Sequence, residues 1–263
     1  LLLADSRVLL GSAQWKNGGL ASAGRLDILS PGSAAVSLPQ SYSTDPGASS
    51  KLLTSTLLAS LNAGTAVTLQ ANNDIMLSTA LNVNNGSGNG GHLTLQAGRS
   101  ILLNADITTD DGNLTLIAND TAANGVVDAH RDAGAAVITQ ATGTSINAGT
   151  GTVTIDLREG VGNTNNAVGV VTLASITAAN LSVQSHGFTA SAIADSKVFD
   201  GTTAAVLSSA SLTGLAFQSG SNLSVVFPTT GSFPNNAVAN EVQVTSAAFK
   251  VTGYSGLAST DLL

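Results

Sequence analysis

A short motif recurs through the middle of the chain: a glycine or small residue, then a stretch in which every second residue is apolar, then a small residue. It is clearest at residues 64–71, 91–97 and 112–118. Strict alternation of apolar and polar residues indicates a β-strand with one buried face. A single strand of this kind cannot bury its apolar face alone, so the repetition predicts copies that stack on one another. More degenerate copies lie at residues 136–141, 151–156, 169–174 and 179–183.

The spacing of the copies predicts their arrangement. The aligned apolar residues are separated by 26, 21, 22, 17 and 18 residues, and they are Leu69, Leu95, Leu116, Ile138, Ile155 and Leu173. Second strands are expected at residues 74–77, 100–105 and 145–148. A rung near 20 residues favours a parallel β-solenoid, in which strands of successive rungs stack about 4.8 Å apart. Leucine-rich repeats are the main competitor, but their Leu-x-x-Leu-x-Leu-x-x-Asn spacing does not recur and no repeat contains a convincing helix.

The register of this solenoid defines its expected core, in which apolar residues point inward and Thr, Ser and Asn point outward. The inward residues are predicted to include Val67, Leu69, Ile75, Leu77, Leu93, Leu95, Ile101, Leu103, Leu114, Leu116, Val137, Ile146, Val153, Ile155, Val171, Leu173, Leu181 and Val183.

Composition excludes several other classes of protein. A mean hydropathy of +0.28 with a net charge of −7 argues against disorder, and no apolar run is long enough for a membrane span. The nine Lys and Arg residues are scattered over a chain with a pI of about 4.6, which argues against nucleic-acid binding. Cysteine is absent, which excludes disulfides and thiolate sites. Only 3% of residues are aromatic, and small aliphatic residues suit thin stacked layers.

The expected class is all-β, with a parallel β-helix over residues 1–189 and a small antiparallel β-domain over residues 190–263. Insertions are expected near residues 30–50, which are rich in Pro, Ser and Gly, and near residues 120–135. Residues 51–61 have helical leucine spacing and could form a short helix packed on the coil. In the C-terminal part the repeat stops and longer alternating strands are expected at residues 223–227, 238–244 and 248–252.

Two parts of the chain resemble large bacterial exoproteins. Residues 52–69, 93–107 and 112–116 resemble the filamentous haemagglutinin and high-molecular-weight adhesin group of two-partner secretion. The segment Lys197–Val198–Phe199–Asp200–Gly201–Thr202–Thr203 resembles the Lys-Val-Tyr-Asp-Gly-Thr-Thr signature that opens the small YDG-type β-domain, with Phe199 in place of the usual Tyr.

The resemblance implies a secreted or cell-surface protein of a Gram-negative bacterium with a long right-handed β-helical shaft, commonly an adhesin. It implies an outer-membrane transporter as partner of the full-length parent, and a host or bacterial surface receptor or glycan as a further partner. The secretion segment that the transporter recognises does not appear as a motif in this chain. Leu1 is not an initiator Met, so the chain reads as a piece of a longer or processed polypeptide.

The alternative is a carbohydrate-active β-helix enzyme with a carboxylate groove. The carboxylates that would form the groove are Asp106, Asp110, Asp111, Asp120, Asp128 and Asp132. Such a groove would also need aromatic platforms and basic partners, but only Arg131 is near, and Trp15 and Tyr42 lie outside the repeats. Asp and Asn at corners also follow from turn chemistry alone. We therefore expect no catalytic residue, unless these carboxylates share a cleft.

Metal and cofactor sites are not expected either. His92, His130 and His186 lack metal-ligand spacing and read as exposed loop residues. The Gly/Asn-rich residues 84–91 lack the Gly-Gly-x-Gly-x-Asp repeat of calcium-binding β-rolls. Residues 152–154, Thr-Val-Thr, resemble an ice-binding ladder, but we expect no repetition of this pair in register. The favoured function is a structural and adhesive segment.

Overall fold

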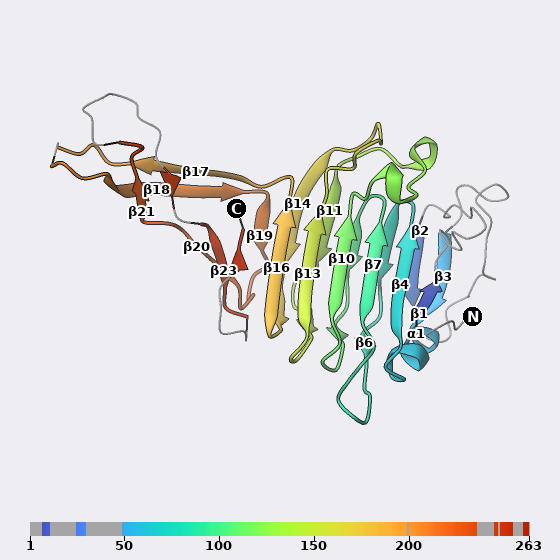
Figure 1. The fold of residues 1–263 in the computed structure, drawn as a ribbon. Helices are drawn as coiled ribbons and strands as arrows, with labels where there is room; N and C mark the ends of the chain where they lie inside the picture. Colours follow the sequence, from blue (N-terminus) through green and yellow to red (C-terminus); the bar gives the residue numbers. More distant parts are fainter. Residues whose placement is uncertain are drawn as a thin grey trace.

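The computed structural model describes residues 7–10, 25–29, 49–198, 200–235, 245–246, 248–254 and 260–262. Most of the strands lie in three parallel sheets that the chain visits in turn, four times over between β4 and β15 (Figure 1). Small antiparallel sheets follow. The predicted all-β class, with parallel strands before an antiparallel region, is therefore confirmed.

The first sheet consists, in spatial order, of β1 (Arg7–Leu10), β4 (Ala66–Ala71), β7 (Leu93–Ala97), β10 (Leu114–Ala118), β13 (Thr152–Leu157) and β16 (Asn180–Ser185). The second consists of β19 (Leu215–Phe217), β14 (Val168–Leu173), β11 (Ala136–Gln140), β8 (Ile101–Leu103), β5 (Asp74–Leu77), β2 (Arg25–Leu29) and β3 (Ser49–Leu53). The third consists of β15 (Ser175–Thr177), β12 (Ser145–Asn147), β9 (Ile107–Thr108) and β6 (Leu81–Asn82).

The predicted rung near 20 residues is wrong, because the aligned residues from which it was derived belong to two different sheets. Ile138 and Leu173 lie in the second sheet, where Ile138 pairs with Ile101 and Val171. In the first sheet the true column runs through residues 69, 95, 116, 155 and 183, with separations of 26, 21, 39 and 28 residues. The error arose because strands of both sheets bury alternate residues, so the sequence pattern does not distinguish one sheet from another.

The core matches the predicted register at all but one position. Of the eighteen predicted inward residues, Val137 alone is not in the buried core. Val137 is half-buried and points outward because its neighbours Ala136 and Ile138 are the inward residues of β11, each with no exposed area. Side chains alternate across a strand, so all three cannot point inward.

A short helix, α1 (Thr54–Leu61), packs against this core through Leu57 and Leu61, which have no exposed area. The helix begins three residues later than the leucine spacing suggests. Leu52 and Leu53 instead pair in β3 with strand β2. The expected insertion near residues 30–50 lies almost entirely outside the described residues.

The segment between β10 and β11 leaves the sheets and forms two short 3-10 helices, η2 (Ala122–Asn124) and η3 (Asp128–His130). We call residues 119–135 the insertion. It accounts for the long separation between β10 and the next strand of the first sheet, β13.

The C-terminal part forms two antiparallel sheets. One has the order β17 (Thr189–Ala194), β18 (Ala204–Thr213), β21 (Thr230–Ser232) and β22 (Thr245–Ser246). The other has the order β20 (Ser224–Val226), β23 (Lys250–Thr252) and β24 (Thr260–Asp261). β20 and β23 correspond to two of the predicted strands, and the third, at residues 238–244, lies outside the described residues.

The C-terminal part is joined closely to the parallel sheets. β19 extends the second sheet, where Val171 pairs with Leu215. We call the three stacked parallel sheets the coil. The hydrophobic cluster inside the coil also includes Leu223, Phe249 and Val251. The β17–β18 hairpin, by contrast, projects away from the stack of strands (Figure 1). None of the helices in the described ranges is long and apolar enough to cross a membrane.

Candidate functional site

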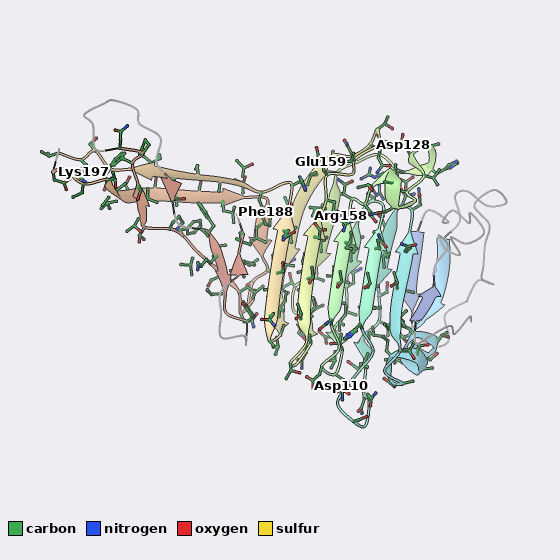
Figure 2. All side chains as sticks on the ribbon, viewed as in Figure 1. Asp110, Asp128, Arg158, Glu159, Phe188 and Lys197 are labelled. Atoms are coloured by element: carbon green, nitrogen blue, oxygen red, sulfur yellow. The ribbon has the colours of Figure 1, made fainter. Side chains whose placement is uncertain are left out.

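The six carboxylates of the proposed groove do not converge on one cleft. Figure 2 shows Asp110 and Asp128 at opposite ends of the long strands. Asp106 accepts hydrogen bonds from the backbone N–H (2.7 Å) and hydroxyl (3.1 Å) of Ser145. Asp110 accepts one from the backbone N–H of Asn85 at 2.6 Å.

Asp111 similarly accepts a hydrogen bond from the backbone N–H of Thr150 at 2.7 Å. Asp110 and Asp111 both have positive φ, 51° and 66°, at the turn between β9 and β10. Asp is one of the few residues other than Gly that tolerates this conformation. These carboxylates therefore join corner loops of neighbouring rungs, as turn chemistry alone would require.

The remaining three carboxylates lie at the opposite corner with separate partners. Asp120 is buried and accepts from the Arg158 guanidinium at 2.7 Å. Asp128 accepts from the backbone N–H and hydroxyl of Thr164, both at 2.7 Å, and these hydrogen bonds lower the pKa of its carboxyl. Asp132 is exposed, 3.7 Å from a guanidinium nitrogen of Arg99.

A buried polar network anchors the insertion to the coil, and sequence reasoning missed it. Arg131 is 3% exposed; its Nε donates to the carbonyl of Gly98 at 2.8 Å, and another guanidinium nitrogen donates to Oδ1 of Asn119 at 2.6 Å. Burial lowers the pKa of Arg131. Asn119 in turn donates to the carbonyls of Arg158 and Asn166, both at 2.9 Å. Every hydrogen bond here involves a group that burial would otherwise leave unpaired.

Two adjacent asparagines form hydrogen bonds to the backbone of the insertion, as the backbone of a neighbouring strand would. Asn72 donates to the carbonyl of Val127 (3.1 Å) and accepts from the N–H of the same residue (2.6 Å). Asn73 donates to the carbonyl of His130 (2.9 Å) and accepts from the N–H of Asp132 (2.6 Å). Each side-chain amide thus satisfies a backbone donor and a backbone acceptor. The sequence signal was three polar residues, 72–74, directly after a strand.

An ion pair also holds the insertion on the coil. We call the contacts made by Asn72, Asn73, Asp74, Arg99 and Arg131 the anchor of the insertion. Arg99 donates from Nε and a terminal nitrogen to the two oxygens of Asp74, at 2.8 and 2.6 Å. This hydrogen-bonded carboxylate raises the pKa of Arg99. Another Arg99 nitrogen donates to the carbonyl of Ala133 at 2.8 Å. The insertion is therefore held in one conformation by the coil beneath it.

The three histidines lie in separate segments. His92 is exposed before β7, where its Nδ1 accepts from the N–H of Asn113 at 2.9 Å. His130 is half-buried in η3, and burial lowers its pKa, so the expectation of an exposed loop residue is wrong for it. His186 is exposed after β16. Within the described ranges no three His, Cys, Asp or Glu side chains gather as metal ligands would.

The outer face of the first sheet carries one column of hydroxyl side chains. Thr68, Thr94, Thr115, Thr154 and Ser182 are aligned in register on successive strands. The position of Thr152 does not repeat in this way, because it aligns with Asn113 and Asn180. A single threonine column exists, whereas the paired Thr-x-Thr pattern does not recur.

The YDG-like signature segment folds into a turn that its own side chains stabilise. The ammonium of Lys197 donates to the carbonyls of Thr202 (3.1 Å) and Ala204 (3.0 Å) and lies 2.8 Å from the carboxylate of Asp200. Asp200 accepts from the N–H and hydroxyl of Thr202, both at 2.9 Å. These contacts, led by the Lys197 hydrogen bond, lower the pKa of Asp200 to about 2. Phe199 lies outside the described residues.

Comparison with known proteins assigns this part of the chain. No curated protein and no solved structure matches the sequence. Residues 187–256 match the family model of the YDG domain, a range that contains the Lys197 turn and the strands from β17 to β23. The chain therefore carries a YDG domain at residues 187–256, directly after the last strand of the first parallel sheet.

Proposed function

We propose that this chain is a structural and adhesive segment of a large exported bacterial surface protein. The three parallel sheets form a right-handed parallel β-helix that serves as a rigid shaft. The right hand follows from the general preference of parallel strand crossovers. The resemblance of residues 52–69, 93–107 and 112–116 to two-partner-secretion exoproteins and the YDG domain at residues 187–256 support the surface location.

The observation that best supports a rigid shaft is the continuity of its hydrophobic core. Apolar columns run through successive strands, and the cluster continues from the coil into Leu223, Phe249 and Val251 beyond it. Each rung contacts its neighbours through parallel hydrogen bonding and stacked side chains, which makes a solenoid stiff along its axis. The YDG domain is then held in line with the shaft instead of on a flexible linker.

Attachment requires surfaces that are presented in a fixed conformation. The insertion meets this condition because Asn72, Asn73 and Arg131 hold its backbone on the coil. Binding loops on a rigid scaffold lose less conformational entropy when they bind. The proposed partner of this surface and of the YDG domain is a host or bacterial surface receptor or glycan, and the transporter is a partner of the full-length parent.

The test is binding of the fluorescently labelled full chain to host cells and to bacterial cells. Ala129→Arg places a bulky charge on the exposed part of the insertion, and Thr115→Arg places the same charge on the shaft as the matched control. We expect Ala129→Arg to weaken binding at least tenfold, or an equivalent change in the YDG domain to do so, while Thr115→Arg stays within about twofold. Absence of binding to any surface, or equal loss in the control, would contradict the proposal.

Two further results would overturn it. Antibody detection of the native protein only in the cytosol of the source bacterium would refute the surface location. Polysaccharide depolymerisation that is abolished by Asp111→Asn would instead favour an enzyme, despite the separation of the carboxylates.

A further inference from the structure

The YDG domain presents a sheet edge without a partner strand. β17 lies at the end of the sheet β17–β18–β21–β22 and is hydrogen-bonded to β18 alone. Among the residues that the structure describes, no strand pairs with its other edge. The hairpin projects from the stack of parallel strands, so this edge extends beyond the coil along its length (Figure 1).

The orientation of the free backbone groups follows from the pairing with β18. The N–H of Asp195 donates to the carbonyl of Val206, so residue 195 points its backbone groups toward β18. The hydroxyl of Ser208 donates to the carbonyl of Ile193 and that of Thr213 to the carbonyl of Thr189, which therefore point the same way. Backbone groups alternate in direction along a strand. The outward-pointing groups consequently belong to Ala190, Ala192 and Ala194.

β17 itself carries few of the features that normally protect an edge strand, and the one irregularity in its pairing with β18 is a register shift between Ile193 and Ala194. β17 has the sequence Thr-Ala-Ser-Ala-Ile-Ala, without a proline or charge. Natural edges are usually guarded by Lys, Pro, a bulge or covering segments, because unpaired N–H and C=O groups recruit other strands. The three outward residues have methyl side chains, which leave the backbone accessible. Next to them Ile193 is 62% exposed.

We propose that the β17 edge pairs with the same edge of a second copy of this chain, antiparallel and centred on Ala192. This register places Ala192 opposite its own copy and Ala190 opposite Ala194 of the other copy, so all outward backbone groups are paired in about six hydrogen bonds. It places Asp195 opposite Thr189, so no like charges face each other. A two-fold axis normal to the sheet keeps equivalent faces on one side and yields one continuous sheet.

The sequence of the strand favours a second copy over a charged partner. A charged partner would need opposite charge on the strand, and β17 has none. The exposed Ile193 would be partly covered by Ser191 of the other copy, because directly opposite cross-strand side chains lie close together. One strand pair is a small interface, and interfaces below about 1,200 Å² are typical of weak association. We therefore expect a dimer that forms at high protein concentration or at high local density on a surface.

Sedimentation of the full chain between about 10 and 500 µM tests the pairing, a range chosen for a small interface. The wild type should show a monomer–dimer equilibrium that strengthens with salt, since each copy carries a net charge of −7. Ala192→Pro removes an outward N–H without removing a hydrogen bond to β18 and should weaken association at least tenfold. Ile193→Lys should do likewise. Val206→Lys is the control, since Val206 is also 62% exposed but lies on the interior strand β18.

A second measurement tests the register without depending on proline. The chain has no cysteine, so Ala192→Cys introduces a single thiol. If two β17 strands pair about this position, their Cα atoms fall within the separation that a disulfide spans. Oxidation should give a covalent dimer at least tenfold faster than for Val206→Cys. A monomeric wild type at every concentration and salt tested, or equal cross-linking of the two cysteine variants, would overturn the proposal.

Discussion

Replacement of Leu95 by Asp is expected to unfold the chain at neutral pH. Leu95 has no exposed area and stacks between Leu69 and Leu116 in the central column of the first sheet. Burial of a leucine side chain contributes about 2–3 kcal/mol, which the substitution removes. A buried carboxyl would also have to stay neutral, and protonation at pH 7 of a group with a pKa of about 3.9 costs about 4 kcal/mol. The sum of about 6–7 kcal/mol is comparable to the whole stability of an ordinary domain.

The neighbouring residue provides the matched control. Thr94 is half-buried on the outer face, between Thr68 and Thr115, so Thr94→Asp places its charge at the surface beside neutral hydroxyls. We expect a change within about 1 kcal/mol. The assay is denaturant unfolding followed by circular dichroism at pH 7 and pH 4.

The pH dependence of Leu95→Asp gives a further check. The carboxyl at position 95 would have a higher pKa in the folded state than in the unfolded state. It therefore lowers the free energy of unfolding at pH values above its unfolded pKa, and this loss disappears as the pH falls below the unfolded pKa. The difference in free energy of unfolding between Leu95→Asp and the wild type should therefore be about 4 kcal/mol smaller at pH 4 than at pH 7. Equal free energies of unfolding for the two variants at pH 7 would refute the inward register of Leu95.

Three further predictions concern the anchor, a tight corner and the signature turn. Arg131→Met should destabilise the chain by about 1–3 kcal/mol and speed proteolysis within the insertion, because it removes a buried hydrogen-bonded guanidinium; limited proteolysis at unchanged sites and rates would contradict this role. Gly98→Ala should cost well over 1 kcal/mol in thermal unfolding, because its Cβ would lie 2.0 Å from a backbone oxygen, whereas Gly86→Ala has nothing within 4 Å of its Cβ and should be near neutral. Lys197→Met should raise the pKa of Asp200 from about 2 toward its ordinary value in an NMR titration. The lowered pKa stabilises the turn above the unfolded pKa, and this effect is lost as the pH falls through about 2; an unchanged pKa in the variant would exclude the ion pair as its cause.

Local alternation predicted much of the core, whereas Leu81, Ile107 and Ile176, on the two- and three-residue strands of the third sheet, are buried without having been predicted. Residues such as Leu114 and Leu116 recur with period 2, and burial of one face per strand then leaves only one side for them. The single error, Val137, occurred where three consecutive residues of β11 are apolar, so the pattern permitted either register. The YDG signature at residues 197–203 was recognised by its resemblance to the family, and the side chains that form its turn act on residues only a few positions away.

Local alternation could not predict which sheet each strand belongs to. Ile138 and Leu116 each lie at the centre of a five-residue strand that buries alternate residues, yet one lies in the second sheet and the other in the first. The insertion between them has no period, so nothing local indicates how many sheets the chain passes before it returns. Partners in a parallel sheet are chosen by stacking with the previous rung, which is a long-range property.

The anchor of the insertion was likewise a product of the tertiary structure. Asn72 and Val127 are 55 residues apart, and their reciprocal hydrogen bonds exist only because the coil brings them to one corner. The free edge of β17 is a similar case, since its sequence does not state which side β18 occupies. The sequence by itself determined the strand pattern, the apolar interior and the signature turn, because these depend on neighbours along the chain. The tertiary structure decided strand partners, the separation of the carboxylates and the exposed edge, because these depend on which distant segments share a rung.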